Sequence, residues 1–143
     1  MKNLKTYLLI FSLGYFLLGC ASTPVPTSDA IQIPDSRVLE GGKQYLSPSK
    51  NSGQFIVKRD TGIMGVACST KIYLNGKGIA DLDASEKVVL NLPEGDYIVS
   101  AEPNGVCGGG LTEVKFNVKV NSLSVFRYGT SGNGSPSIYP TAF

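Results

Sequence analysis

The pattern that decides the fold is clearest in residues 111–120, which read Leu-Thr-Glu-Val-Lys-Phe-Asn-Val-Lys-Val. From position 114 onward, valine or phenylalanine alternates with lysine or asparagine. Because successive side chains of a strand point to opposite faces of a sheet, this alternation predicts a strand with one buried side and one solvated side.

Six further stretches have strand character and are separated by turn signals: residues 55–59, 70–74, 78–82, 87–92, 96–101 and 122–128. Asn75-Gly76 predicts a tight hairpin, and Pro93-Glu94-Gly95 predicts a type I or II turn. Seven short strands of this spacing predict an all-β fold, a small antiparallel β-sandwich. An eight-stranded barrel is the alternative.

Two stretches resemble PEGA-type surface modules. Residues 72–80 (Ile-Tyr-Leu-Asn-Gly-Lys-Gly-Ile-Ala) are similar to the strand–turn–strand opening of these modules. Residues 92–99 (Leu-Pro-Glu-Gly-Asp-Tyr-Ile-Val) are similar to their Pro-x-Gly-x-Tyr turn, although Asp96 stands where the named motif has alanine. The resemblance covers residues 55–128 and implies an immunoglobulin-like core, as in small bacterial lipoproteins of unknown function. It implies little about function, because sandwiches host many unrelated tasks.

The first residues have the features of a secretion signal. Lys2 and Lys5 precede an apolar run at 7–18, which is shorter than the roughly 20 residues that a membrane-spanning helix needs. The run ends in Leu-Leu-Gly-Cys at 17–20, which resembles the lipobox of bacterial lipoproteins at every position. The resemblance implies cleavage between Gly19 and Cys20, a diacylglyceride on the Cys20 sulfur and an acyl chain on its amino group. An ordinary signal peptide cut near Ala21-Ser22 is the alternative.

These features divide the chain into a signal peptide (1–19), a lipidated tether (20–53), a β-sandwich domain (54–130) and a C-terminal tail (131–143). The tether is rich in proline, serine, threonine and glycine, a composition that predicts a flexible stalk. Whether its scattered apolar residues pack on the domain is left open: Ile31, Ile33, Val38, Leu39, Tyr45 and Leu46. In the tail, we expect Ile138, Tyr139 and Phe143 to fold back on the sandwich or to meet a partner.

The location follows from the lipobox and the cysteines. Ala21 directly after the lipidated cysteine resembles the sorting pattern of lipoproteins held in the outer membrane facing the periplasm, with the inner membrane as the alternative. Cys68 and Cys107 are then an even pair in an oxidising compartment, which predicts a disulfide. The alternatives are two free thiols or a metal site, but with no histidine and no Cys-x-x-Cys the other zinc ligands are missing.

Composition excludes several classes of function. Without histidine, Ser-His-Asp and Cys-His catalytic sets cannot form. The chain has 13 basic and 11 acidic residues, and loss of Lys2 and Lys5 with the leader leaves eleven of each, which gives no sign of a nucleic-acid partner. Residues 81–86 superficially resemble a calcium loop. Glu86 and Leu92 stand where such a loop needs glycine and a bidentate acid, so we expect a solvated turn.

Residues 105–110 read Gly-Val-Cys-Gly-Gly-Gly and lack the lysine and hydroxyl residue that follow the glycines of a phosphate-binding loop. They form either a flexible loop pinned by Cys107 or a constrained loop that offers a partner Gly105, Val106, Gly108, Gly109 and Gly110. We expect a non-enzymatic envelope lipoprotein in a structural or interaction role, attached to the membrane, with no cofactor and no small-molecule substrate. The alternative is an inhibitor or immunity-type lipoprotein that binds a periplasmic enzyme through residues 66–70 and 104–110.

Overall fold

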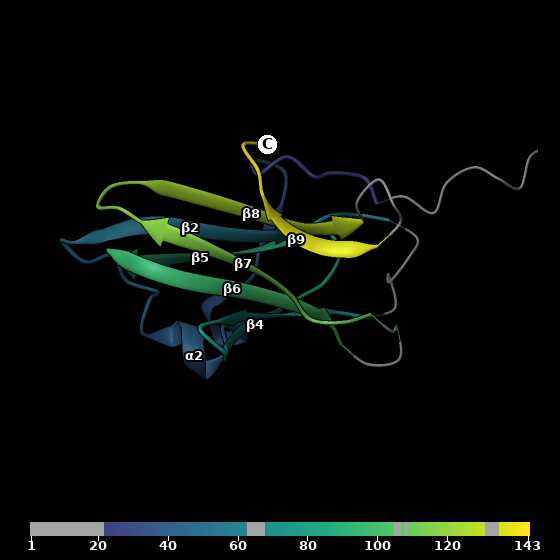
Figure 1. The fold of residues 1–143 in the computed structure, drawn as a ribbon, viewed down its shortest axis with the longest axis horizontal. Coiled ribbons are helices and arrows are strands. Elements are labelled where there is room, and N and C mark those ends of the chain that lie inside the picture. The colour runs from purple at the N-terminus through teal and green to yellow at the C-terminus, as the bar shows by residue number, and fades with distance from the viewer. Residues whose placement is uncertain (1–21, 63–67, 105–106, 108, 131–134) are drawn as a thin grey trace, which may run out of the picture.

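The computed structural model describes residues 22–62, 68–104, 107, 109–130 and 135–143, which form a two-layer β-sandwich (Figure 1). One sheet has the strand order β1-β5-β2-β8-β9 and the other has the order β4-β3-β6-β7. The first sheet contains β1 (Ile31–Gln32), β2 (Ser52–Arg59), β5 (Glu86–Pro93), β8 (Leu123–Thr130) and β9 (Pro136–Pro140). The second contains β3 (Thr70–Leu74), β4 (Lys77–Leu82), β6 (Gly95–Pro103) and β7 (Thr112–Val118). Two separate sheets make the fold a sandwich and not a barrel.

All seven strands expected from the sequence are present, as β2 to β8, but the first sheet is mixed. β1 pairs with β5 and β2 pairs with β8 in parallel, whereas the other pairs are antiparallel. In immunoglobulin constant-type domains the first, second, fourth and fifth strands share a sheet. Here β2 and β3 lie in different sheets, so the strand order is not that of an immunoglobulin domain. The expectation of a purely antiparallel sandwich was wrong, because strand alternation reports burial and not which distant strand is the partner.

The Asn75-Gly76 hairpin signal is confirmed, whereas the type I or II geometry expected at Pro93-Glu94-Gly95 stays a prediction. Asn75 and Gly76 have φ of 47° and 76°, the left-handed geometry of a tight hairpin, and they join β3 to β4. The turn after Pro93 carries the chain from β5 in one sheet to β6 in the other. The Tyr97 hydroxyl donates a hydrogen bond to the Pro93 carbonyl oxygen (2.9 Å) and so ties the new strand to the end of the old one.

The core lies between the sheets and is built from the alternating apolar residues. Phe55 in β2 is fully buried, and its ring stacks on that of Phe116 in β7 with 5.1 Å between centroids. Phe126 in β8 contacts both rings at 5.8 and 4.8 Å. Burial of such a side chain stabilises the fold by about 1.5–3 kcal/mol. The apolar face expected for residues 111–120 is therefore confirmed within β7, whereas Val120 lies beyond the strand and is partly exposed.

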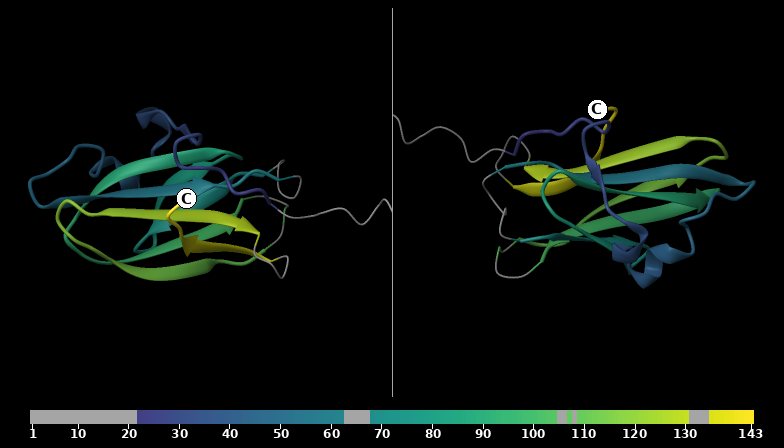
Figure 2. Two further views of the ribbon diagram at one scale, coloured as in Figure 1. Left: turned by 90° about the horizontal axis from the view of Figure 1, so that it is seen from above. Right: turned by 180° about the vertical axis from the view of Figure 1, so that it is seen from behind.

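The segment expected to be a flexible tether packs on the sandwich from Ser22 onward, so that expectation was wrong for its described part. Figure 2 shows this purple and blue segment crossing the outside of the sheets. Four of its apolar side chains are at least nine-tenths buried: Val25, Ala30, Ile33 and Val38. Helices η2 (Asp35–Arg37) and α2 (Glu40–Lys43) follow β1, and the Leu39 N–H next to α2 donates to the Ile79 carbonyl oxygen of β4 (2.9 Å).

The reason for this packing is that β2 is buried on both sides. Its outer face carries Ile56 and Lys58, which are both at least nine-tenths buried. The Lys58 ammonium donates to the Val25 carbonyl oxygen (2.5 Å) and to the main-chain oxygen of Phe143. The tail also joins the fold, because β9 pairs with β8 and Ile138 is buried, as expected of a segment that folds back. The sandwich thus extends beyond residues 54–130 in both directions.

Candidate functional site

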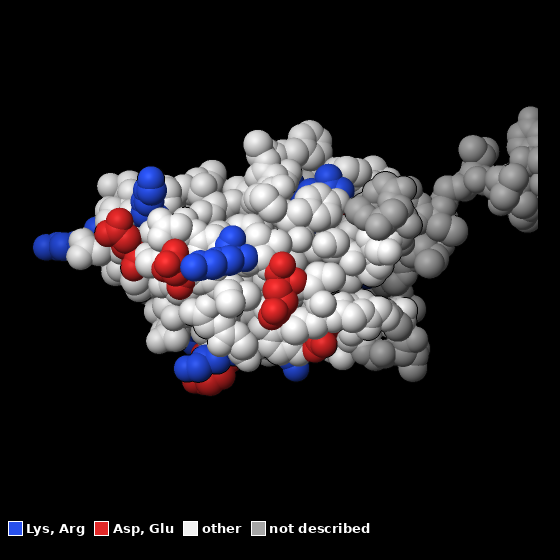
Figure 3. Space-filling view, viewed as in Figure 1, with Lys and Arg blue, Asp and Glu red and all other residues white. Residues whose placement is uncertain are grey.

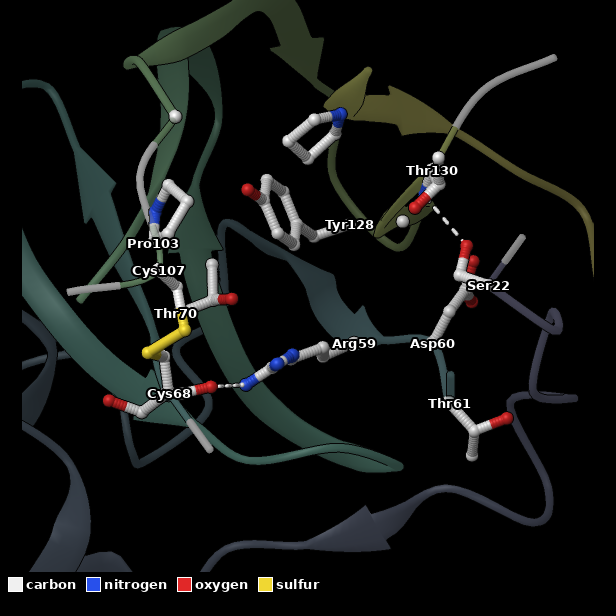
Figure 4. A pocket seen from close by; sticks show the side chains of 14 residues that line it. Ser22, Arg59, Asp60, Thr61, Cys68, Thr70, Pro103, Cys107, Tyr128 and Thr130 are labelled. Atoms are coloured by element: carbon white, nitrogen blue, oxygen red, sulfur yellow. Dashed lines mark hydrogen bonds between the residues drawn. A yellow bond between two sulfur atoms is a disulfide. The ribbon is translucent and has the colours of Figure 1, made fainter. Parts of the chain in front are cut away.

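A cavity of about 290 Å³ lies at one end of the sandwich (Figure 4). Here β2, β6 and β8 end, and β3 and β9 begin. We call this region the disulfide end and define it by Arg59, Thr70, Pro103, Thr130 and Pro136, which all line the cavity. The lining also includes the first docked residue, Ser22, and both cysteines of the disulfide.

The predicted disulfide is present between Cys68 and Cys107. Their Cα atoms lie 6.1 Å apart, within the range that a disulfide spans. Cys68 precedes β3 and Cys107 follows β6, so the bond joins the two chain segments that leave the same end of adjacent strands. It indicates an oxidising, extracytoplasmic location for the folded protein.

A buried ion pair lies on the other side of the cavity. Asp60 is 4% exposed, and its Oδ2 lies 2.7 Å from Nη2 of Arg127 in β8. Burial raises the pKa of the Asp60 carboxyl, and the charge of Arg127 opposes that shift. Gly129 must lack a side chain here, because an added Cβ would overlap the Asp60 carboxylate. Such a pair is costly to break, since removal of one partner leaves a buried charge without compensation.

Arg59 and Tyr128 bring polar groups to the middle of the cavity. The Arg59 guanidinium is buried and donates from Nη1 to the carbonyl oxygens of Cys68 (2.5 Å) and Leu82 (3.0 Å). Burial lowers its pKa, but an arginine stays charged at any physiological pH. The Tyr128 hydroxyl points toward Pro103 (Figure 4), is buried, and has no hydrogen-bond partner within the described structure. Burial raises the pKa of this phenol.

The charged side chains of this arrangement are held by partners within the fold. The Asp60 carboxylate is held by Arg127, and Arg59 is held by main-chain carbonyls, so both charges serve to fix the strand ends. The cavity offers a ligand the Tyr128 hydroxyl, proline rings and the disulfide. No group of three or more His, Cys, Asp or Glu residues that could hold a metal ion occurs in the described ranges. Those ranges also contain no helix long and apolar enough to cross a membrane.

The residues expected from the sequence fall into three sets. Cys68 and Cys107 meet as predicted, and Gly109 and Gly110 are exposed beside them, with Gly109 lining the cavity. The solvated turn expected near residues 81–86 joins β4 to β5, where Arg37 makes two hydrogen bonds to Glu86 (2.5 and 2.9 Å). The remaining expected site residues lie outside the described residues: Gly19, Cys20, Gly105, Val106 and Gly108.

Sequence reasoning missed Arg59, Asp60, Tyr128 and Ser22. The first three belong to or adjoin strands that were recognised correctly. The three consecutive charges of Lys58, Arg59 and Asp60 at the end of β2 were the available signal. Arg127, the ion-pair partner of Asp60, lies far away in sequence, so no local pattern indicated that this ion pair is buried.

No protein-family model matches this chain, and no curated protein matches it.

Proposed function

We propose that this chain is a bacterial envelope lipoprotein, in which acyl chains on Cys20 anchor a non-catalytic β-sandwich with a structural or protein-interaction role. The observation that carries the proposal is the sequence Leu-Leu-Gly-Cys at 17–20. It follows an apolar run too short to span a membrane and stands directly before the docked segment. Ala21 favours the periplasmic face of the outer membrane, with the inner membrane as the alternative.

Two structural features support this function. The disulfide between Cys68 and Cys107 fits export from the cytoplasm, which the leader would direct. The charged residues of the cavity are engaged in holding the fold together, which supports a non-catalytic role. Two or more acyl chains would make the attachment stable, because each buried methylene contributes about 0.8 kcal/mol.

Labelling with a fatty acid in a bacterial host tests the anchor. Cys20→Ala should abolish the label and leave an uncleaved or wrongly cleaved precursor. The matched control is the Cys68→Ala/Cys107→Ala double variant, which keeps only the cysteine at position 20 and should retain the label. A label that persists in Cys20→Ala, or an unacylated mature N-terminus in the unaltered protein by mass spectrometry, would falsify the proposal.

We further propose a kinship with PEGA-type modules. It is supported by the two turns that carry the resemblance, which stand between β3 and β4 and between β5 and β6. An experimental structure of a PEGA-type module with the same two strand orders would support the kinship. A module whose strands pair in a different order would contradict it.

The second candidate function is inhibition of a periplasmic enzyme through the loops around the disulfide. The observation in its favour is the cavity at the disulfide end, flanked by the exposed Gly109, Gly110 and Leu111. Affinity purification with the mature domain tests it. Capture of an enzyme in stoichiometric amount, lost on deletion of residues 108–110, would support inhibition. A set of partners that ignores this deletion would count against it.

A further inference from the structure

The distance between the anchor and the folded domain is set by very few residues. Ser22 is docked on the sandwich, and only Ala21 separates it from Cys20. Two residues of extended chain span at most about 7 Å between the Cα atoms of Cys20 and Ser22. A flexible stalk over residues 20–53 would instead have placed the domain about 30 Å from its anchor. The packed segment therefore removes almost all of the expected stalk.

Several contacts fix the chain where it leaves the domain. The Ser22 hydroxyl oxygen accepts a hydrogen bond from the Thr130 N–H (2.6 Å) at the end of β8. Thr23 and Thr61 exchange main-chain hydrogen bonds of 2.7 and 3.1 Å. Val25 is 8% exposed, and its N–H donates to Oδ1 of Asp60 (3.4 Å). All of these contacts are at or next to the disulfide end, so the chain leaves the domain there.

Three of the connections at the disulfide end lack exposed charge in their described residues. The described residues within 61–70, 103–112 and 129–137 include no Asp, Glu, Lys or Arg, and the neighbouring Arg59 and Asp60 are buried. The fourth connection at this end, between β4 and β5, does carry acidic residues, and Arg37 pairs with Asp83 and Glu86. Leu111, beside the cavity, is 52% exposed. Uncharged residues such as those described here, with an exposed leucine, lose little when they enter a headgroup layer, whereas charged side chains would lose hydration.

The opposite end of the sandwich is different. A charged residue lies in or directly next to each connection between strands there: Lys50, Lys77, Glu94 and Lys119. Figure 3 shows charged side chains gathered toward the left end of the visible face, while the described atoms at the right-hand tip are white. Apart from the connection between β4 and β5, the end from which the chain leaves toward Cys20 therefore exposes fewer charges than the opposite end.

We propose that the disulfide end of the sandwich rests against the phospholipid surface in which Cys20 is anchored. This placement rests on the proposed lipidation of Cys20. The headgroup region of one leaflet is roughly 5–8 Å deep, similar to the reach of the two-residue connection. An acylated Cys20 at the membrane interface leaves no room for a layer of free water between the lipid and Ser22. The cavity then opens toward the headgroups.

Tryptophan fluorescence can measure this placement, because the chain contains no tryptophan. Leu111→Trp puts a probe at the disulfide end. Leu123→Trp is the matched control: it replaces the same residue type, is similarly exposed (61%), and lies at the opposite end, where β8 begins. Each mature protein is purified from bacterial membranes and placed in phosphatidylethanolamine–phosphatidylglycerol vesicles with brominated acyl chains. We expect quenching and a blue shift for Leu111→Trp and neither for Leu123→Trp.

A spacer variant provides a second measurement. About twelve Gly and Ser residues inserted between Ala21 and Ser22 add a root-mean-square length of about 20 Å and should relieve the quenching of Leu111→Trp. Equal quenching of the two probes, or no quenching of either, would overturn the placement. Mass spectrometry of the same samples separates the two proposals. Acylated protein with an unquenched Leu111→Trp overturns the placement alone, whereas protein without acyl chains overturns the proposed function and the placement with it.

Discussion

Replacement of Ile33 by alanine tests whether the segment before β2 is part of the folded domain. Ile33 is 1% exposed and belongs to the main core cluster, although it lies in a stretch whose composition predicted a stalk. An Ile→Ala change at a buried site costs about 2–5 kcal/mol, through lost transfer free energy and the cavity left behind. Ile31 is the matched control, because it is the same residue type two positions earlier and is 63% exposed. Ile31→Ala should stay within about 0.5 kcal/mol of the unaltered protein.

Urea denaturation of the mature domain, followed by circular dichroism, measures both variants. With a slope of about 1–3 kcal/mol/M, a loss of about 3 kcal/mol lowers the urea midpoint by about 1–3 M for Ile33→Ala. The midpoint of Ile31→Ala should hardly move. If both variants unfold at the midpoint of the unaltered protein, the segment does not pack as described. The inference that the domain lies close to its membrane anchor would then also lose its support.

Two further predictions concern the disulfide and a tyrosine. The Cys68→Ala/Cys107→Ala variant should lose about 4 kcal/mol of unfolding free energy, because the bond closes a loop between residues 39 apart in sequence; an unchanged urea midpoint would contradict this. The hydrogen bond from the Tyr73 hydroxyl to the Glu102 carboxylate raises the pKa of Tyr73 to about 12, so stabilisation from this bond is present below pH 10 and is lost as the pH rises through 12. Spectrophotometric titration should detect this phenol, and Glu102→Gln should return its pKa toward 10, whereas identical titration curves would refute the assignment.

The sequence predicted those parts of the fold that depend on local patterns. Strand character between turn signals located β2 to β8, and period-two alternation indicated the buried face of β7. Asn75-Gly76 was read correctly because a tight hairpin requires positive φ at both positions. The disulfide followed from counting, since only Cys68 and Cys107 remain after the lipobox cysteine. None of these inferences needed knowledge of distant contacts.

The parts that were missed all depend on contacts between residues far apart in the chain. The burial of Lys58 was not predicted, because its ammonium is covered by the two ends of the described chain, through Val25 and Phe143. Burial lowers the pKa of Lys58, as expected for an ammonium removed from water. The Asp60–Arg127 pair is likewise invisible in sequence, because Asp60 directly follows β2 and Arg127 lies in β8, far away in the chain. From its composition alone, the segment before β2 was predicted to be a flexible stalk. Four well-spaced apolar residues of this segment are nevertheless buried and dock it on the sandwich.

The docked segment also bears on the choice between the two candidate functions. An inhibitor that plugs an enzyme cleft must present its loops away from the membrane, on a stalk long enough for the enzyme to approach. Here the uncharged loops around the disulfide leave the same end as the two-residue connection to Cys20, so an anchored protein would have them at the lipid surface. A soluble enzyme would instead meet the opposite end, with Lys50, Lys77, Glu94 and Lys119. Capture of an enzyme by the soluble domain but not by the vesicle-bound lipoprotein would mean that lipid and enzyme compete for one surface. Equal capture by both forms would assign the interaction to the charged end.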